Sequence, residues 1–459
     1  VGALAAADGT ITIDASSYTS GLYKLIDVTG YGKVDYSKIL TAFGENLTVI
    51  DNDLWIGAVD RSTILVDSSF AGKYNIGDEI VDHEGFFYGF NAFATAKEAS
   101  AYWNGTIELI PGSAADESLS SSNIELKNQN LDLTLTGKAP EHQFPFFKLD
   151  NSDSNFKSSL AVKDAEFAWS KLDIRRNATA TITDSSIDFE FPSDKHLNPT
   201  IGVYYNGKVD IARSTITDGQ MSITGELNLD KNSTWLNYAS SQIAENGIVT
   251  VSNGSKLILS KTAIGKAYEG RVNPNRDEKL AELVVDNAEL ATRDDAYYYE
   301  VTSFTLGDGG EYAGKITLRN GATATLGYRE SMLINSNGTI DIDNAALIIP
   351  EQRTILSGSI ESLAELVNNG TINVTGNSKV NIWKMSGNAV NLKDATLTDS
   401  KLGNVKVYGT NSVTDTELGN VNIGYGMDDS TESAKLSVIG NSKLGYTYVC
   451  LLYTSPRPR

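Results

Sequence analysis

Hydrophobic and polar residues alternate in short runs through most of this 459-residue chain, and many runs end at an Asn or Gly followed by a small residue. The clearest copies are Val249–Leu257, Ile316–Ala324, Ile340–Leu347, Ile372–Val380 and Leu436–Leu444, and looser copies are Leu172–Ile182, Val209–Ile216, Leu227–Leu236 and Leu283–Leu290. Alternation directs every second side chain of a short strand to the same face, and Asn or Gly accepts the left-handed backbone that a sharp corner requires. The pattern therefore predicts short strands joined by corners.

The spacing of these corners favours a parallel β-solenoid. Asn232 and Asn253 are 21 residues apart, and the steps from Asn287 through Asn320 and Asn344 to Gly376 are 33, 24 and 32 residues. Such intervals lie within the period of solenoid coils, and their unevenness predicts loops of different lengths. Antiparallel hairpins are the structural alternative, but they need tight turns between paired neighbours. Here each corner instead resembles the corner one coil later. We predict an all-β, right-handed parallel β-helix over residues 105–449.

The segment before residue 105 has a different pattern. Four strand-like runs, Thr10–Ile13, Leu22–Val28, Leu47–Ile50 and Leu54–Val59, predict a small antiparallel β unit over residues 1–60. Residues 61–104 are interpreted as an aromatic-rich bridge followed by a short helix.

That helix is predicted over Ala92–Trp103. Thr95 and Glu98 fit a capping box, in which each side chain satisfies a free backbone amide at the helix start. A helix of about two turns is too short to be stable alone in water, so it must pack on a neighbour. We expect it to cover the first rung of the solenoid, with Ile107 and Leu109 in that rung.

The short Ala-rich helix, Asn104-Gly105-Thr106-Ile107 and the apolar strand that follows resemble the entry to a pectin-lyase-like parallel β-helix. That family includes bacterial surface adhesins and autotransporter passengers. The resemblance implies a non-enzymatic, extracellular bacterial surface protein. Residues 9–27 likewise resemble the end of a passenger β-helix, so residues 1–60 are interpreted as the terminal cap of a preceding module in a longer tandem array. The alternative is a self-sufficient N-terminal domain.

The last ten residues, 450–459, resemble a translated sequencing adapter, as in a metagenomic fragment, and are expected to be a non-native tail. Cys450 is the single cysteine of the chain. Without it, an extracellular protein would depend on stacked coils rather than on disulfides.

Charge narrows the range of partners. The formal net charge of −20 and the pI near 4.6 disfavour nucleic acid and anionic membranes, because no basic stripe is present to neutralise phosphate. No apolar run reaches the roughly 18 residues that a membrane-spanning helix needs.

Three segments interrupt the alternation and combine aromatic rings with carboxylates and amides: 139–158, 189–199 and 266–300. Carbohydrate sites use such groups, because an aromatic face stacks on a sugar ring while polar groups bind its hydroxyls. The predicted binding residues are Phe144, Phe146, Phe147, Tyr204, Tyr205, Tyr268, Asp294, Asp295, Tyr297, Tyr298 and Tyr299. The expected partner is a carbohydrate or a cell-surface glycoprotein. The alternative is that these aromatic residues only seal the loops onto the solenoid.

An enzyme is the rival class. Glycoside hydrolysis needs two carboxylates at one bond, and Asp294 with Asp295 is the best local pair. The Asn-Thr-Asp, His-Gly and Arg-Ile-Lys motifs of polygalacturonases with this fold are absent. The three histidines are scattered, and no phosphate loop or Gly-x-Ser-x-Gly motif occurs, so no metal or cofactor is predicted. We therefore predict an adhesin-like protein without catalytic residues. A polysaccharide lyase, a glycoside hydrolase and a purely structural spacer remain as alternatives.

Overall fold

The computed structural model describes residues 11–13, 23–26, 39–41, 47–50, 53–56, 63–66, 88–90, 106–109, 124–128, 131–189, 200–237, 240–266, 280–292, 304–326, 332–349, 365–424 and 434–449. These residues form an all-β structure, a parallel β-helix, and no helix occurs among them. The helix predicted over Ala92–Trp103 lies outside the described residues. Nor does any helix in the described part have the length and hydropathy to cross a membrane.

Backbone contacts divide the chain into two compact units, which are described separately. The first contains residues 1–122, 131–143 and 160–167, and the second contains residues 123–130, 144–159 and 168–459.

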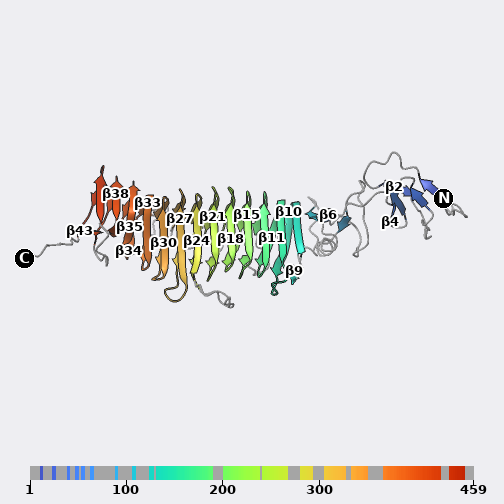
Figure 1. The fold of residues 1–459 in the computed structure, drawn as a ribbon, viewed down its shortest axis with the longest axis horizontal. Helices are drawn as coiled ribbons and strands as arrows, with labels where there is room; N and C mark the ends of the chain where they lie inside the picture. The colour runs from blue at the N-terminus through green and yellow to red at the C-terminus, as the bar shows by residue number, and fades with distance from the viewer. Residues whose placement is uncertain are drawn as a thin grey trace, which may run out of the picture. The chain divides into compact units, whose positions relative to one another are not determined.

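The second unit is the β-helix, in which each coil contributes strands to three parallel ladders (Figure 1). Ladder A begins with the end of β11 (Ser158–Ile174). It continues through β14 (Thr200–Val203), β17 (Gln220–Ile223), β20 (Ser241–Ile243), β23 (Thr262–Ile264), β26 (Phe304–Leu306), β29 (Met332–Ile334), β32 (Leu366–Asn368) and β34 (Met385–Gly387). Ladder B contains β12 (Ala178–Thr183), β15 (Lys208–Ala212), β18 (Glu226–Asp230), β21 (Ile248–Ser252), β24 (Leu280–Asp286), β27 (Ala313–Arg319), β30 (Gly338–Asp343) and the first half of β33 (Thr371–Ile382). Ladder C contains β13 (Ser186–Phe189), β16 (Thr215–Asp218), β19 (Thr234–Leu236), β22 (Lys256–Leu259), β25 (Glu289–Thr292), β28 (Thr323–Thr325), β31 (Ala346–Ile349) and the second half of β33.

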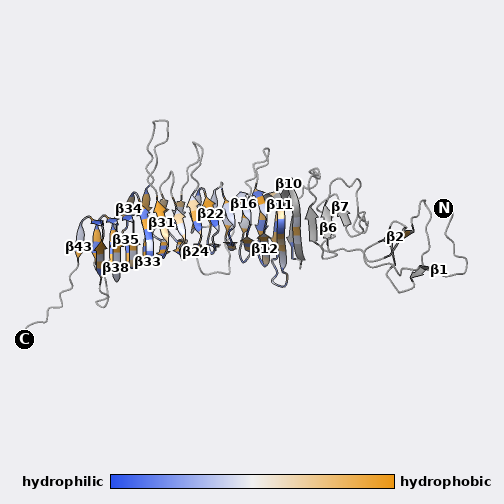
Figure 2. Cartoon of the chain, turned by 90° about the horizontal axis from the view of Figure 1, so that it is seen from above, coloured by the Kyte–Doolittle hydropathy of each residue, from blue (hydrophilic) through white to orange (hydrophobic). Residues whose placement is uncertain are grey.

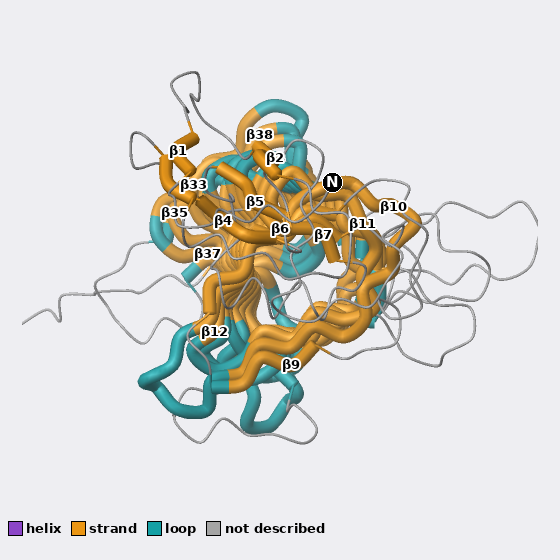
Figure 3. The backbone as a smooth tube through the Cα atoms, turned by 90° about the vertical axis from the view of Figure 1, so that its right-hand side faces the viewer, coloured by secondary structure: helices purple, strands orange, loops and turns teal. Residues whose placement is uncertain are grey.

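The later coils are shorter and continue from β33. They contain β35 (Val390–Thr398), β36 (Lys401–Leu402), β37 (Val405–Tyr408), β38 (Thr410–Thr414), β39 (Glu417–Leu418), β40 (Val421–Ile423), β41 (Lys435–Ile439), β42 (Lys443–Leu444) and β43 (Thr447–Val449). Seen end-on, the strands of successive coils overlie one another (Figure 3).

Equivalent residues stack in register from coil to coil. Ile211 of β15 pairs with Ile182 on one side and with Leu229 on the other, and all three side chains are fully buried. The inward rows therefore form continuous apolar columns, while hydrophilic residues alternate with them along the strands (Figure 2). All pairings between the described strands of 249–380 are parallel, so the hairpin alternative is wrong.

Coil lengths vary as the sequence predicts. Paired residues of ladder B are 18 residues apart at Val209 and Leu227 but 34 apart at Val249 and Leu283. Two predicted interruptions need correction. Within the segment 139–158, residues 139–150 do not leave the strand pattern, because β10 (Leu131–Asp150) continues through them. Residues 266–300 do not form a single excursion, because β24 and β25 within them are ordinary coil strands.

The predicted backbone at the corners is confirmed. The residues at the corner between ladders B and C have positive φ at Asp184, Arg213, Asn232, Asn253, Asn287, Asn320, Asn344, Gly376, Asp399, Asp415 and Gly440. Asn and Asp enter the left-handed region more readily than other non-Gly residues, which explains their repetition there.

A column of buried serines follows four of these corners. The amide of Ser185 donates to Ser214 Oγ at 3.1 Å, that of Ser214 to Ser233 Oγ at 3.2 Å, and that of Ser233 to Ser255 Oγ at 3.2 Å. We call Ser185, Ser214, Ser233 and Ser255 the serine column. It satisfies amides that the strand ladders leave unpaired at the corner.

An asparagine column stabilises the corner between ladders A and B. Asn206 Nδ2 donates to Asn177 Oδ1 at 2.8 Å, and Asn177 Nδ2 donates to the carbonyl of Asn151 at 3.1 Å. Corner backbone groups and amide side chains are therefore paired between coils as well as within them.

The first unit holds two small sheets and the first parallel pairs of the solenoid type. In one sheet, β5 (Asp53–Ile56) pairs antiparallel with β2 (Tyr23–Ile26) and β4 (Leu47–Ile50), as predicted. In the other, β1 (Ile11–Ile13) pairs with β3 (Ile39–Thr41) in parallel, so the unit is not wholly antiparallel.

Parallel pairing also reaches into the segment interpreted as a bridge. There β6 (Thr63–Val66) pairs with both β7 (Tyr88–Phe90) and β8 (Thr106–Leu109). β10 (Leu131–Asp150) then pairs with β8 and with β9 (Ile124–Lys127). The boundary proposed at residue 105 stays a prediction.

Candidate functional site

The outer face of ladder A carries a polar groove. Gln242, Ala263 and Thr305 occupy equivalent outward positions on β20, β23 and β26. A hollow of about 440 Å³ lies over these three positions and the chain segments next to them. The polar residues that line this ladder A groove are Gln220, Ser240, Ser241, Gln242, Lys261, Thr262, Lys266, Thr305, Asp308 and Asn335.

Two lysines flank β23 in the ladder A groove. Lys261 immediately precedes this strand and Lys266 follows it by two residues, and both side chains are exposed. Neither forms an ion pair with another described residue. Together with the amides of Gln220, Gln242 and Asn335, the lysines offer hydrogen-bond donors to sugar hydroxyls or to an anionic substituent.

Asp308 lies at one end of the groove and is held by its own loop. Its Oδ1 accepts hydrogen bonds from Gly310 N at 2.7 Å, Asn337 Nδ2 at 2.9 Å and Tyr312 N at 3.1 Å. Partial burial opposes ionisation, but these hydrogen bonds outweigh it and lower the pKa of Asp308. A carboxylate that stays ionised in this way suits a structural acceptor and not a general acid.

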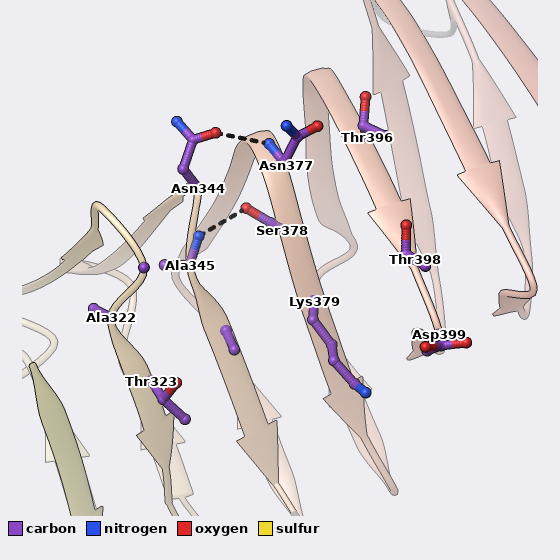
Figure 4. A pocket seen from close by; sticks show the side chains of 12 residues that line it. Ala322, Thr323, Asn344, Ala345, Asn377, Ser378, Lys379, Thr396, Thr398 and Asp399 are labelled. Atoms are coloured by element: carbon purple, nitrogen blue, oxygen red, sulfur yellow. Dashed lines mark hydrogen bonds between the residues drawn. The ribbon is translucent and has the colours of Figure 1, made fainter. Parts of the chain in front are cut away.

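A second groove lies over the corner between ladders B and C (Figure 4). It measures about 390 Å³ and is lined by Asn344, Asn377, Lys379, Thr396, Thr398 and Asp399, among others. At its upper edge Asn377 N donates to Asn344 Oδ1 at 3.0 Å, and below it Ala345 N donates to Ser378 Oγ at 3.4 Å (Figure 4). We call it the corner groove.

An exposed tryptophan that was not predicted from the sequence lies four residues along the chain from Lys379, which lines the corner groove. Trp383 follows β33 directly and is 40% exposed, with the Lys401 ammonium 4.6 Å from its ring centroid. The alternation of Lys379, Val380, Asn381, Ile382 and Trp383 was the available signal, because it directs the indole outward.

The predicted binding residues fall into different environments. Phe147 is fully buried on β10 and pairs with Ile124, so it belongs to the core. Its prediction as a binding residue is therefore corrected. Phe144 and Phe146 lie on the same strand, but their side chains are not among those that the structure describes.

Tyr204 and Tyr205 pack on two arginines of the preceding coil. The Arg175 guanidinium lies 5.0 Å from the Tyr204 ring centroid, and Arg175 also pairs with the buried Asp173 at 2.8 Å. Tyr204 is 7% exposed and lies against Gly202, where any Cβ would collide with its ring. This packing favours the sealing alternative for Tyr204.

Tyr205 is half-buried, and the Arg176 guanidinium lies 5.3 Å from its ring centroid. Arg176 binds Asp150 through two hydrogen bonds, at 2.9 and 3.0 Å.

The remaining candidates, Tyr268, Asp294, Asp295, Tyr297, Tyr298 and Tyr299, lie outside the described residues and stay predictions.

Within the described residues, no group of three or more His, Cys, Asp or Glu side chains is placed to hold a metal ion. Comparison with known proteins found no matching family model, no matching curated protein and no matching solved structure. The geometry of the two grooves is therefore the basis for a functional assignment.

Proposed function

We propose that this chain is a non-enzymatic carbohydrate-binding protein of the bacterial surface-adhesin type, located outside the cell, which holds a glycan in the ladder A groove. The observation that carries the proposal is the set of outward amides and hydroxyls that successive coils align on one face, together with two lysines that form no ion pair with another described residue. A glycan chain needs such a row of donors and acceptors, because its hydroxyls recur along its length.

The carboxylate content of the groove supports binding over hydrolysis. Asp308 is the one carboxylate among the described lining residues, and its Oδ1 is already engaged by three donors. A glycosidase needs a second carboxylate across the scissile bond. The backbone of the groove floor is also rigid, since it belongs to the parallel ladder.

The test is a glycan array on the full chain, followed by titration calorimetry with each glycan that binds. The double variant Lys261→Gln/Lys266→Gln should weaken binding of the best glycan about tenfold, as expected when two charge-assisted hydrogen bonds are removed. The matched control is Lys393→Gln/Lys406→Gln, which removes the same charge from β35 and β37, away from the groove.

Release of reducing ends from a bound polysaccharide would replace the proposal with an enzyme. An array without hits would favour the structural spacer. Equal loss of affinity in both double variants would show a general charge effect and would move the site away from the ladder A groove.

A further inference from the structure

The second half of β33 and the residue that follows it present a row of three outward side chains, which begins at Lys379 in the corner groove. Lys379, Asn381 and Trp383 alternate with Val380 and Ile382, which are buried in the core. Trp383 stays aligned with the coil, because its amide donates to the carbonyl of Ile349 at 3.1 Å. Alternate residues of a strand are about 6.6 Å apart, so the row extends over roughly 13 Å from the lysine to the indole.

Trp383 ends the row with a flat apolar surface. It is 40% exposed, whereas Trp235 of the same β-helix is fully buried. The ammonium of Lys401 lies 4.6 Å from the indole centroid, and Lys401 stands next to Asn381 in the ladder register. An aromatic ring beside a cation is suited to a sugar that carries a negative charge, since the ring stacks on the sugar while the ammonium attracts the charge.

The cations in this row are available to a ligand. Lys379 is exposed and forms no ion pair with another described residue. Lys401 lies 3.8 Å from Glu417, but both side chains are about half exposed, so that pair is weak and exchangeable. Two available cations on one strip of a chain with a net charge of −20 favour an acidic ligand.

Hydroxyl and amide groups complete the strip at its lysine end. The corner groove that Lys379 lines also contains Asn377, Thr396, Thr398 and the carboxylate of Asp399 (Figure 4). These groups can bind the hydroxyls of a sugar whose acidic substituent reaches the lysine.

We propose that Lys379, Asn381, Trp383 and Lys401, together with the corner groove, form a second binding site, which takes a short oligosaccharide containing acidic sugars. One sugar ring stacks on Trp383, the following ring bonds to Asn381, and a carboxylate of the ligand pairs with Lys379. This inference rests on the proposed function for its ligand class, but its residues are separate from the ladder A groove.

The experiment titrates the full chain with an oligogalacturonate and with a neutral cello-oligosaccharide of equal length. Trp383→Ala should weaken oligogalacturonate binding about tenfold, and Trp383→Phe should retain most of it because the stacking face remains. Lys379→Gln should remove the preference for the acidic oligomer over the neutral one. Lys393→Gln on β35 is the matched control and should bind as the unmodified chain does.

The variant Lys261→Gln/Lys266→Gln separates this inference from the proposed function. If it abolishes oligogalacturonate binding and Trp383→Ala does not weaken it, the ladder A groove binds carbohydrate and the second site is refuted. Equal affinity for the acidic and neutral oligomers would also overturn the assignment. An effect of Trp383→Ala that survives the lysine double variant would support it.

Discussion

Replacing Ser233 by Ala should destabilise the coil at the centre of the serine column. Ser233 is completely buried, its Oγ accepts from Ser214 N at 3.2 Å, and it donates to the carbonyl of Asp230 at 2.6 Å. Alanine removes both bonds and adds almost no cavity. The buried amide of Ser214 then loses its acceptor.

The expected cost follows from that amide. A buried donor without a partner costs about 1–3 kcal/mol, which is more than the net value of an ordinary hydrogen bond. Because each coil of a solenoid contacts only its neighbours, the effect should be local. Amides near Ser214 should exchange with solvent roughly 5 to 150 times faster, as a change of 1.4 kcal/mol is about tenfold.

Hydrogen exchange measured by mass spectrometry on peptides covering 208–236 tests this directly. Two controls bracket the result. Ser154→Ala removes an exposed hydroxyl from the turn after β10 and should change nothing. Ser233→Thr should retain protection, because Thr416 accepts from Ser400 N at the equivalent corner, at 3.3 Å, while 1% exposed. If the peptides covering 208–236 exchange at the same rate in Ser233→Ala as in Ser154→Ala, the predicted role of the Ser233 hydroxyl is refuted.

Three further predictions address the core, a close backbone approach and pH. Trp235→Ala should lower the free energy of unfolding by about 3–5 kcal/mol in guanidinium titrations, because a fully buried indole and its 3.0 Å bond to the Asp218 carbonyl are lost. Gly247→Ala should cost about 1–3 kcal/mol or prevent soluble expression, since its Cβ would collide with the Ile223 carbonyl. Gly310→Ala should be tolerated, because its Cβ would meet only the Asp308 carboxylate at ordinary contact distance. The pKa of Asp308 is lowered in the folded chain, so its stabilisation is complete above about pH 4 and is lost as the pH falls through the folded value. Exchange of 307–312, corrected for intrinsic rates, should therefore increase in the unmodified chain as the pH falls below the ordinary pKa of an aspartate, and Asp308→Asn should remove that pH dependence.

Local requirements explain why the corners could be predicted from the sequence. A left-handed backbone at Asn232, Asn253 or Asn320 is a property of one residue, and the residue type indicates it. Alternation likewise separates Ile211 from its polar neighbours without any knowledge of other coils. The parallel β-helix follows from these two signals.

The grooves could not be predicted, because they depend on register between coils of unequal length. Gln242, Ala263 and Thr305 stand side by side although 21 and 42 residues separate them in the sequence. For Phe147, in contrast, a binding role was predicted and the structure shows a core residue. It belongs to a cluster of aromatic residues around a proline, which suggested a loop, but β10 continues through the cluster and places Phe147 opposite Ile124 in the core.

The long connections show how this fold tolerates variation beside a fixed surface. Chain segments that pass from ladder C to ladder A vary from Gly219 alone, between β16 and β17, to residues 350–365, between β31 and β32. The entropic cost of closing a loop rises only slowly with its length, and the paired Ser and Asn side chains at the other corners link coil to coil independently of it. The ladder A groove lies at the end of these connections, since Ser240 and Lys261 directly precede β20 and β23. The floor of the groove is therefore determined by the stacking of the ladder A strands. Insertions in the connections at its border can change in length without disturbing that ladder. A binding surface built in this way can acquire new specificity at little cost in stability.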